Sequence, residues 1–303
     1  MGLTSSNLQF ILKKNKKYKF SGPILTFGNQ DIYATAENIR RWAKEDDILL
    51  SQPRTILSST SGDVPTINKE AKNYIHARTF FEFLGISEEE YYDIDKFDFD
   101  RPKIIHDLQY PVESRYHDFF NLIVDSGTLE HIFDVRAVME NIVKMTKTGG
   151  YVLQFIPAQN FLNHGFYQFS PTFFYDFYLA NGFEIVESYI VEIRGTYDRY
   201  HAYDQEKDYT GLFFNPKNRL VNCFLSRKVR KVDRIELPNQ FFYEKLTEDT
   251  KAVAQDFQKT LIDKISVSVR SAIPIRFHGM FFGLYSFLKR VSAKRKHIDI
   301  RKQ

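Results

Sequence analysis

The chain has 303 residues, of which 43% are hydrophobic and 16% aromatic, enough to bury one large core plus a smaller appendage, which excludes disorder throughout. Residues 239–303 hold 13 Lys/Arg and 6 Asp/Glu, net +7, so the first 238 residues hold 29 and 32, net −3, and this main body is not a polyanion binder. The single cysteine, Cys223, excludes an internal disulfide and a cysteine-rich metal site, which predicts a reducing compartment and a buried, structural thiol.

The first twenty residues carry no sustained apolar run and no small-residue cleavage site, so they do not predict a secretory signal. Met1-Gly2 followed by Ser6 fits a myristoylation pattern only loosely. Together with the lone cysteine, this leads us to expect a cytoplasmic protein.

Short apolar segments that end in Gly, Asp, Ser or Pro recur along the main body, as is typical of strands in a buried parallel sheet. They are PILTFG (23–28), EYYDID (90–95), KIIHDL (103–108), NLIVDS (121–126) and YVLQFIP (151–157). Between the last two, apolar residues recur at helical spacing from Ile132 to Val143, and Gly149-Gly150 are expected to close that helix. The pattern predicts a βαβ unit.

A helix around Pro171 to Asn181 is expected next, followed by the strands EIVESYIVEI (184–193) and RLVNCFLSRK (219–228). With no helix between them, these two strands should pair antiparallel at the sheet edge. The predicted fold is therefore α/β. Residues 1–238 form a Rossmann-like, doubly wound, mostly parallel sheet with an antiparallel edge pair, and residues 239–303 form a basic helical extension.

Polar residues gather where the predicted strands end. Gly28 ends the first strand, Asp95 the second, Asp107 the third and Asp125 the fourth, and Glu130-His131 follow. An open α/β sheet binds its ligand outside the carboxyl ends of its strands, where the strand order reverses. The sequence therefore predicts a ligand crevice at this edge.

From about Phe20 to Lys228 the sequence resembles class I S-adenosylmethionine-dependent methyltransferases. The block FFNLIVDSGTLEHIFD…KTGGYVLQFIP carries the resemblance, and PILTFG stands where the family has its glycine-rich first loop. Through NHGFYQFSPTFFYDFY (163–178) the chain looks most like methyltransferase-domain proteins associated with bacterial surface-polysaccharide and sugar modification. The resemblance implies S-adenosylmethionine as cofactor and O-methylation of a sugar or glycan intermediate by in-line methyl transfer.

The resemblance also implies a cofactor-binding set at the strand ends. Asp95, with Asp93 in reserve, would accept hydrogen bonds from the ribose hydroxyls. Asp107 would accept one from the adenine amino group, beside the apolar Ile105 and Leu108. Gly28 would let the backbone approach the donor, because a Cβ there would intrude. The floor below the sulfonium would be lined by Asp125, Ser126 and Gly127.

The acceptor side is expected to use Glu130, His131 and His164. Glu130 or His131 would face the incoming acceptor, and His131 or His164 would remove the proton of a hydroxyl acceptor, because an imidazole titrates near neutral pH. No His/Asp/Glu cluster has convincing metal-ligand spacing along the sequence, so no metal is predicted.

Structural roles are the alternative for each of these residues. The acids in DIDKFDFD can form a solvated turn, and His131 can be a helix N-terminal residue held by local hydrogen bonds. The aromatic residues of 166–178 are expected mostly in the core or in a lid, and some of them in an apolar acceptor wall.

The first loop departs from the family pattern. Thr26 and Gln30 stand where the family usually has an acid and a second glycine. About sixty residues separate the first two strands, against roughly twenty in an ordinary dinucleotide fingerprint. The insert of about 34–88 includes a polar stretch (51–66) and an expected helix (68–85), and it could be a lid or a substrate-recognition element. A degenerate fold that no longer binds the donor and acts as an interaction scaffold is the alternative function.

The extension is expected to contain a helix over 251–264 and, in 279–302, ten uncharged residues before a basic cluster. Ten residues are too few to span a bilayer, which needs about twenty. The segment suits peripheral contact with an anionic membrane at its inner face, or packing on the main domain or a partner. No nucleic-acid partner is expected, and the sequence does not predict an oligomeric state.

Overall fold

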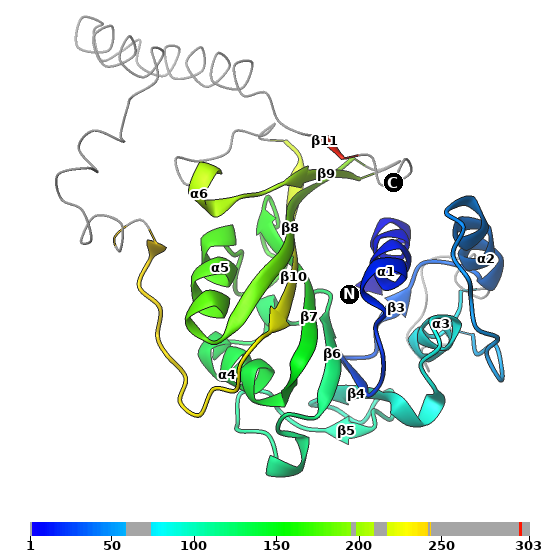
Figure 1. Cartoon of the computed structure of the whole chain (residues 1–303), viewed down its shortest axis with the longest axis horizontal. Helices are drawn as coiled ribbons and strands as arrows, with labels where there is room; N and C mark the ends of the chain where they lie inside the picture. The colour runs from blue at the N-terminus through cyan, green and yellow to red at the C-terminus, as the bar shows by residue number, and fades with distance from the viewer. Residues whose placement is uncertain are drawn as a thin grey trace, which may run out of the picture.

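The computed structural model describes residues 2–58, 74–194, 198–208, 217–241, 243 and 297–298. Within these residues, one sheet of nine strands runs through the centre of the molecule in the order β11-β9-β8-β10-β7-β6-β2-β4-β5 (Figure 1). A two-stranded sheet joins β1 (Gly2–Leu3) to β3 (Asp31–Ile32). The strands of the main sheet are β2 (Ile24–Phe27), β4 (Tyr91–Asp95), β5 (Ile104–Ile105), β6 (Phe120–Asp125), β7 (Thr146–Gln159), β8 (Phe183–Ile193), β9 (Arg199–Ala202), β10 (Arg219–Lys228) and β11 (His297–Ile298).

Five strands pair in parallel, in the order β5-β4-β2-β6-β7. The chain moves outward from β2 to β4 and β5, then returns to the other side of β2 with β6 and β7. The strand order therefore reverses between β2 and β6, which is the doubly wound order. This confirms the Rossmann-like fold expected from the sequence. The predicted third strand, 103–108, is reduced to the two residues of β5.

The antiparallel pairing of the last two predicted strands is also confirmed. β10 pairs antiparallel with β8 from Arg219 to Lys228. It pairs antiparallel with β7 as well, so it is inserted between β7 and β8 and not at the outer edge. Beyond β8, the short β9 continues the sheet.

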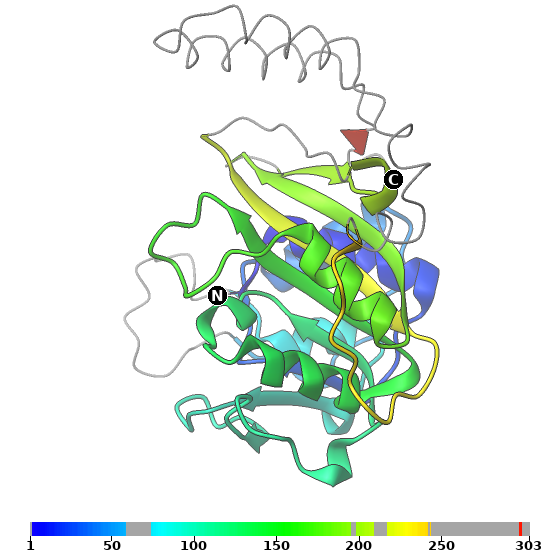
Figure 2. The ribbon, with the colours of Figure 1, turned by 90° about the vertical axis from the view of Figure 1, so that its left-hand side faces the viewer.

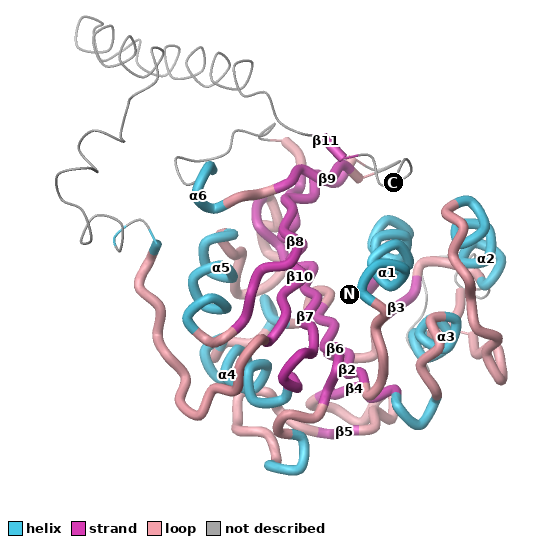
Figure 3. The backbone as a smooth tube through the Cα atoms, viewed as in Figure 1, coloured by secondary structure: helices cyan, strands magenta, loops and turns pink. Residues whose placement is uncertain are grey.

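One face of the sheet is covered by α1 (Ser5–Tyr18), which the sequence analysis did not predict (Figure 3). Thr4 begins this helix, because its hydroxyl accepts a hydrogen bond from the Asn7 amide. Phe10 points from α1 into the core, where its ring stacks on Tyr200 at 5.4 Å between centroids. The amino-terminal helix is therefore part of the main domain.

The described parts of the insert pack on the same face. They contain α2 (Ala36–Glu45) and α3 (Ala77–Phe83). Trp42, Phe80 and Phe81 are buried in the core that these helices share with α1. The helix expected over 68–85 was placed too early, because it begins at Ala77 behind the His76 cap and 59–73 lie outside the described residues. These two helices form a cover layer of the sheet. A role of the insert as a lid or a substrate-recognition element stays a prediction.

The other face of the sheet is covered by α4 (Val135–Met145) and α5 (Pro171–Ala180), which lie side by side in Figure 2. Both helices match the expected positions. α5 contributes Phe174, Phe177 and Tyr178 to a second core with the apolar face of α4. The sheet therefore lies between two helical layers, as the fold class requires.

The end of α4 differs from the prediction. The helix stops at Met145, and Gly149, with φ +89°, lies inside β7 instead of capping the helix. The buried Lys228 of β10 caps it, because its Nζ donates to the carbonyl oxygens of Val143 at 2.8 Å and Thr146 at 2.7 Å. A cation at a helix carboxyl end also complements the helix dipole.

In the part of the chain that the structure describes, three single turns of 3-10 helix connect these elements: η2 (Glu88–Glu90), η3 (Ser114–Tyr116) and η4 (Leu129–His131). The short helix α6 (Gln205–Asp208) follows β9. Among the described residues, no helix combines the length and the apolar character needed to cross a bilayer. The helix expected over 251–264 and the segment 279–302, apart from β11, lie outside the described residues.

Candidate functional site

The carboxyl ends of β2, β4 and β6 meet at Gly28. Its amide donates to the Ile94 carbonyl at 2.8 Å. A Cβ built on Gly28 would lie 3.6 Å from Asp95 Oδ2 and 3.8 Å from Thr128 Oγ1, which is ordinary van der Waals contact. Within the protein a side chain would thus find room, but the φ of +71° at this position favours glycine. The close approach of the donor to Gly28 stays a prediction. Thr128, which the sequence analysis did not single out, also donates to the Phe27 carbonyl at 2.9 Å.

The two carboxylate oxygens of Asp95 have different surroundings. Its Oδ1 accepts a hydrogen bond from the Phe97 amide at 2.9 Å, which is the solvated turn considered as its structural alternative. Its Oδ2 would lie 3.6 Å from a Cβ built on Gly28. One carboxylate oxygen thus holds the loop after β4, and the other faces the place where the strand order reverses.

Asp93, the reserve residue for the ribose, lies elsewhere. It is 7% exposed, and its Oδ1 accepts from the Lys103 amide at 2.7 Å. It lines a cavity of about 530 Å³ beside β4 together with His76 and Lys103. Burial raises the pKa of Asp93, although the Lys103 amide opposes this. Asp95 is therefore the residue that the fold brings to Gly28.

Asp107 is already engaged by its neighbours. Its Oδ2 pairs with Lys96 Nζ at 2.9 Å, and its Oδ1 accepts from the Gln109 amide at 3.1 Å. Burial alone would raise the pKa of Asp107, but the hydrogen bonds from Lys96 and Gln109 outweigh it and lower the pKa. The neighbouring apolar Ile105 is 59% exposed. The adenine role of Asp107 stays a prediction.

Asp125, Ser126 and Gly127 lie at the carboxyl end of β6, where the chain turns. Asp125 is fully buried and accepts from the Thr128 amide at 3.0 Å and from Gln154 Nε2 at 3.3 Å. Burial raises the pKa of Asp125 to about 6, although these two hydrogen bonds act in the opposite direction. Ser126 is also buried, and Gly127 supplies the positive φ of +88° that the turn requires. Their role as a floor below the sulfonium stays a prediction.

The loop after β2 is filled by its own side chains. Thr26 Oγ1 shares a hydrogen bond with the Tyr91 hydroxyl at 2.9 Å. Gln30 is 3% exposed and donates from its side-chain amide to the Phe27 carbonyl. The two departures from the family pattern therefore stabilise this loop by internal hydrogen bonds.

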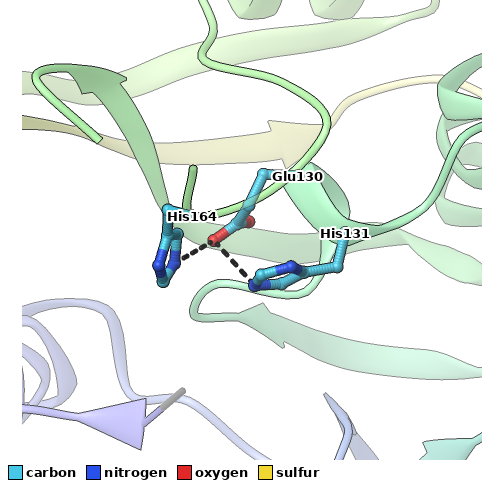
Figure 4. Close-up of side chains that lie close together, drawn as sticks. All are labelled: Glu130, His131 and His164. Atoms are coloured by element: carbon cyan, nitrogen blue, oxygen red, sulfur yellow. Dashed lines mark ion pairs between the residues drawn. The ribbon is translucent and has the colours of Figure 1, made fainter. Parts of the chain in front are cut away.

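Glu130, His131 and His164 come together at the end of η4 (Figure 4). Both imidazoles point their Nε2 atoms at the same carboxylate oxygen of Glu130, at 3.8 Å for His131 and 3.5 Å for His164. The side chain of Glu130 is fully buried, whereas those of His131 and His164 are 42% and 31% exposed. The cluster is thus a buried acid beneath two accessible bases.

The loop between β7 and α5 places His164 on this cluster. The Phe166 amide donates to the Glu130 carbonyl at 2.8 Å, and the Tyr167 amide does so at 3.3 Å. Gly165 allows this approach, because a Cβ there would lie 2.7 Å from the same carbonyl oxygen. The sequence predicts His164 as a base, but it gives no sign of the role of Gly165 or of the contact with Glu130.

Burial is the main cause of the pKa shifts of all three side chains in the cluster. Burial raises the pKa of Glu130 to about 8, and the nearby carboxylate of Asp125 raises it further. The pKa of His131 is lowered, first by burial and then by repulsion from His164. Burial is also the main reason that the pKa of His164 is lowered. Both imidazoles are therefore neutral near pH 7 and can accept a proton.

Exposed apolar side chains lie within two residues of the cluster along the chain. Phe133 is 68% exposed, Leu162 86% and Phe166 65%, and the rings of Phe133 and Phe166 pack edge to face with centroids 5.5 Å apart. The other predicted aromatic residues of 166–178 are buried or half-buried in the core. Exposed apolar patches of this kind are typical of ligand-binding surfaces.

Comparison with protein-family models finds no match, and comparison with curated proteins finds none either. Solved structures that share distant similarity include TehB from Haemophilus influenzae, 15% identical, with 49% of this chain and 52% of that chain covered and a TM-score of 0.32. Another is the branched-chain polyamine synthase C9 mutein from Thermus thermophilus, 11% identical, covering 77% and 58%, with a TM-score of 0.38.

A third is a Burkholderia thailandensis 1,6-didemethyltoxoflavin-N1-methyltransferase with bound S-adenosylhomocysteine, 10% identical, covering 75% and 78%, with a TM-score of 0.35. The chain spans just over half the length of the first two structures. At these identities and TM-scores, the function of this chain rests on its own residues.

Proposed function

We propose that this protein transfers a methyl group from S-adenosylmethionine to a hydroxyl group of a sugar or glycan intermediate. The observation that carries this proposal is the meeting of Gly28, Asp95 and Thr128 at the point where the strand order reverses. Thr128 directly precedes η4, which holds Glu130 and His131. Donor and acceptor groups would therefore occupy adjoining places.

The residues around Gly28 fit the ribose end of such a donor. Asp95 would accept hydrogen bonds from the ribose hydroxyls through Oδ2, because Oδ1 already holds Phe97. The exposed face of Ile105 would pack against the adenine ring. When bound, the donor supplies an electrophilic methyl group on a sulfonium. The protein contributes mainly position, by holding the two reactants at near-attack distance.

The acceptor hydroxyl must lose its proton as it is methylated. His131 or His164 would take that proton, and the imidazolium formed would lie beside Glu130 Oε1. A positioned base of this kind contributes roughly 10²–10⁴-fold to the rate. The exposed rings of Phe133 and Phe166 offer an apolar surface on which the C–H face of a sugar can stack.

Calorimetric titration with S-adenosylmethionine and S-adenosylhomocysteine tests the donor site. We expect binding to the wild type, loss of binding in Asp95→Ala and in Asp107→Ala, and normal binding in His131→Ala. Asp98→Ala, which removes an exposed acid from the same turn, is the matched control and should bind normally. Loss of donor binding in His131→Ala would contradict its acceptor-side role.

A scaffold without donor binding is the second candidate function, and the loop after β2 favours it. Gln30 fills this loop with its own side chain, whereas a glycine there would leave room for a ligand. If neither ligand binds the wild type, this second function becomes the better account. A Gln30→Gly variant that gains donor binding would identify the filled loop as the cause.

A further inference from the structure

We propose that Glu130, His131 and His164 form a binding site for one divalent transition-metal ion of the class of Zn²⁺. Binding of the ion does not depend on the proposed methyl transfer. Only its use in catalysis, described below, rests on that function.

The three side chains already have the approximate spacing of a metal site. One ligand atom from each lies within 4.8 Å of the other two. The Nε2 atoms of His131 and His164 lie 3.8 and 3.5 Å from Glu130 Oε1. Neighbouring ligands of a tetrahedral ion, at bonds of about 2.0–2.2 Å, are about 3.3–3.6 Å apart. Small movements of the two half-exposed imidazoles would therefore complete the coordination.

The buried carboxylate is the second observation that indicates a cation. Glu130 has no exposed surface, and neither of its side-chain oxygens has a hydrogen-bond partner. Buried polar groups are almost always paired, because an unpaired one loses its hydration without compensation. A bound cation would supply that compensation, and the two histidines lie on the solvent side, where an ion can enter.

The backbone around the site is fixed by contacts from two segments. The Phe166 and Tyr167 amides bind the Glu130 carbonyl and hold the loop that bears His164 against η4. Gly165 is required for this approach. The positions of the ligands are therefore determined by backbone contacts that do not need the ion, as in a preorganised site.

The ligand chemistry selects the kind of ion. Two imidazole nitrogens and one carboxylate oxygen suit Zn²⁺ and its first-row neighbours, whereas Mg²⁺ and Ca²⁺ take mainly oxygen ligands. Three protein ligands leave a position open for water or for the acceptor hydroxyl. On the ion, the O–H bond of that hydroxyl breaks more readily, its electron pair stays on oxygen and its proton leaves to solvent. When the ion is bound, His131 and His164 are its ligands. The ion, and not a histidine base, then promotes the loss of the hydroxyl proton.

Metal titration tests the site directly. The full chain is treated with a chelator, freed of it, and titrated with Co²⁺ by visible absorption and with Zn²⁺ by calorimetry. We expect one ion per chain in the wild type. The variants Glu130→Gln and His164→Ala should each weaken binding by at least about 100-fold, since even outer partners of metal ligands contribute 10–100-fold. His117→Ala, which removes an exposed histidine from another loop, is the matched control and should bind as the wild type does.

Thermal unfolding with and without Zn²⁺ shows whether a variant that fails to bind the metal is still folded. A ligand that binds only the folded state raises the unfolding temperature, so Zn²⁺ should stabilise the wild type and His117→Ala but not the two ligand variants. Equal binding in all four proteins, or no binding by a folded wild type, would overturn the proposal. Neither readout involves S-adenosylmethionine, so failure of the metal site and failure of the proposed methyl transfer are distinguishable.

Discussion

Replacing Glu130 with glutamine should make the metal-free protein more stable at neutral pH. Glu130 is fully buried without a hydrogen-bond donor, and burial raises its pKa from 4.5 to about 8. Glutamine has nearly the same shape and cannot ionise. The variant therefore keeps the packing of η4 and removes the one group in the cluster whose charged form is strongly disfavoured.

The sign and size of the effect follow from proton linkage. Because the folded-state pKa is raised, the contribution of Glu130 to stability is full below pH 4.5 and is lost as the pH rises towards 8. Between these values the folded chain keeps a proton that the unfolded chain releases, so stability falls by about 1.4 kcal/mol per pH unit. From pH 4.5 to pH 7 the loss amounts to about 3 kcal/mol in the wild type, and Glu130→Gln should avoid it.

Urea unfolding at a series of pH values from 4.5 to 8, with a chelator present, measures this difference. Glu113→Gln, which neutralises an exposed carboxylate, is the charge-matched control. The two curves of unfolding free energy against pH should diverge as the pH rises, with the Glu130→Gln curve above. Parallel curves for the wild type and Glu130→Gln would refute the reasoning, because they would mean that the Glu130 carboxylate is not desolvated.

A Cβ at Gly165 would lie 2.7 Å from the Glu130 carbonyl oxygen. Gly165→Ala should therefore lower the free energy of unfolding by about 1–3 kcal/mol and weaken Co²⁺ binding. Wild-type stability and wild-type Co²⁺ binding in this variant would show that the loop between β7 and α5 moves to accommodate the methyl group. In competition calorimetry, Asp95→Asn should weaken S-adenosylhomocysteine binding less than Asp95→Ala, since the amide keeps one acceptor oxygen, and equal loss would point to charge as the determinant. Lys228→Met should lower the unfolding free energy by about 1–3 kcal/mol, because the carbonyls at the end of α4 lose their donor; an unchanged midpoint in urea would contradict the capping role.

Local patterns in the sequence were sufficient for most of the sheet. Short apolar runs with polar ends predicted β2, β4 and β6 within a residue or two, because a strand buried on both faces must be apolar along its length. The same logic placed Gly28 and Asp95 at neighbouring strand ends. It failed for the end of α4, where glycines in β7 resembled a helix cap and the true cap is Lys228, which comes from β10 far along the chain.

Only the tertiary structure decided how distant segments meet. Contacts between residues far apart in sequence decide three features. They insert β10 between β7 and β8, pack α1 on the sheet and separate Asp93 from Asp95. The same holds for the candidate site. Glu130 and His131 are neighbours in sequence, but His164 reaches them through a loop held by backbone hydrogen bonds. Sequence spacing carries no signal for such a cluster, because the chain folds back through β7 before it supplies the third side chain.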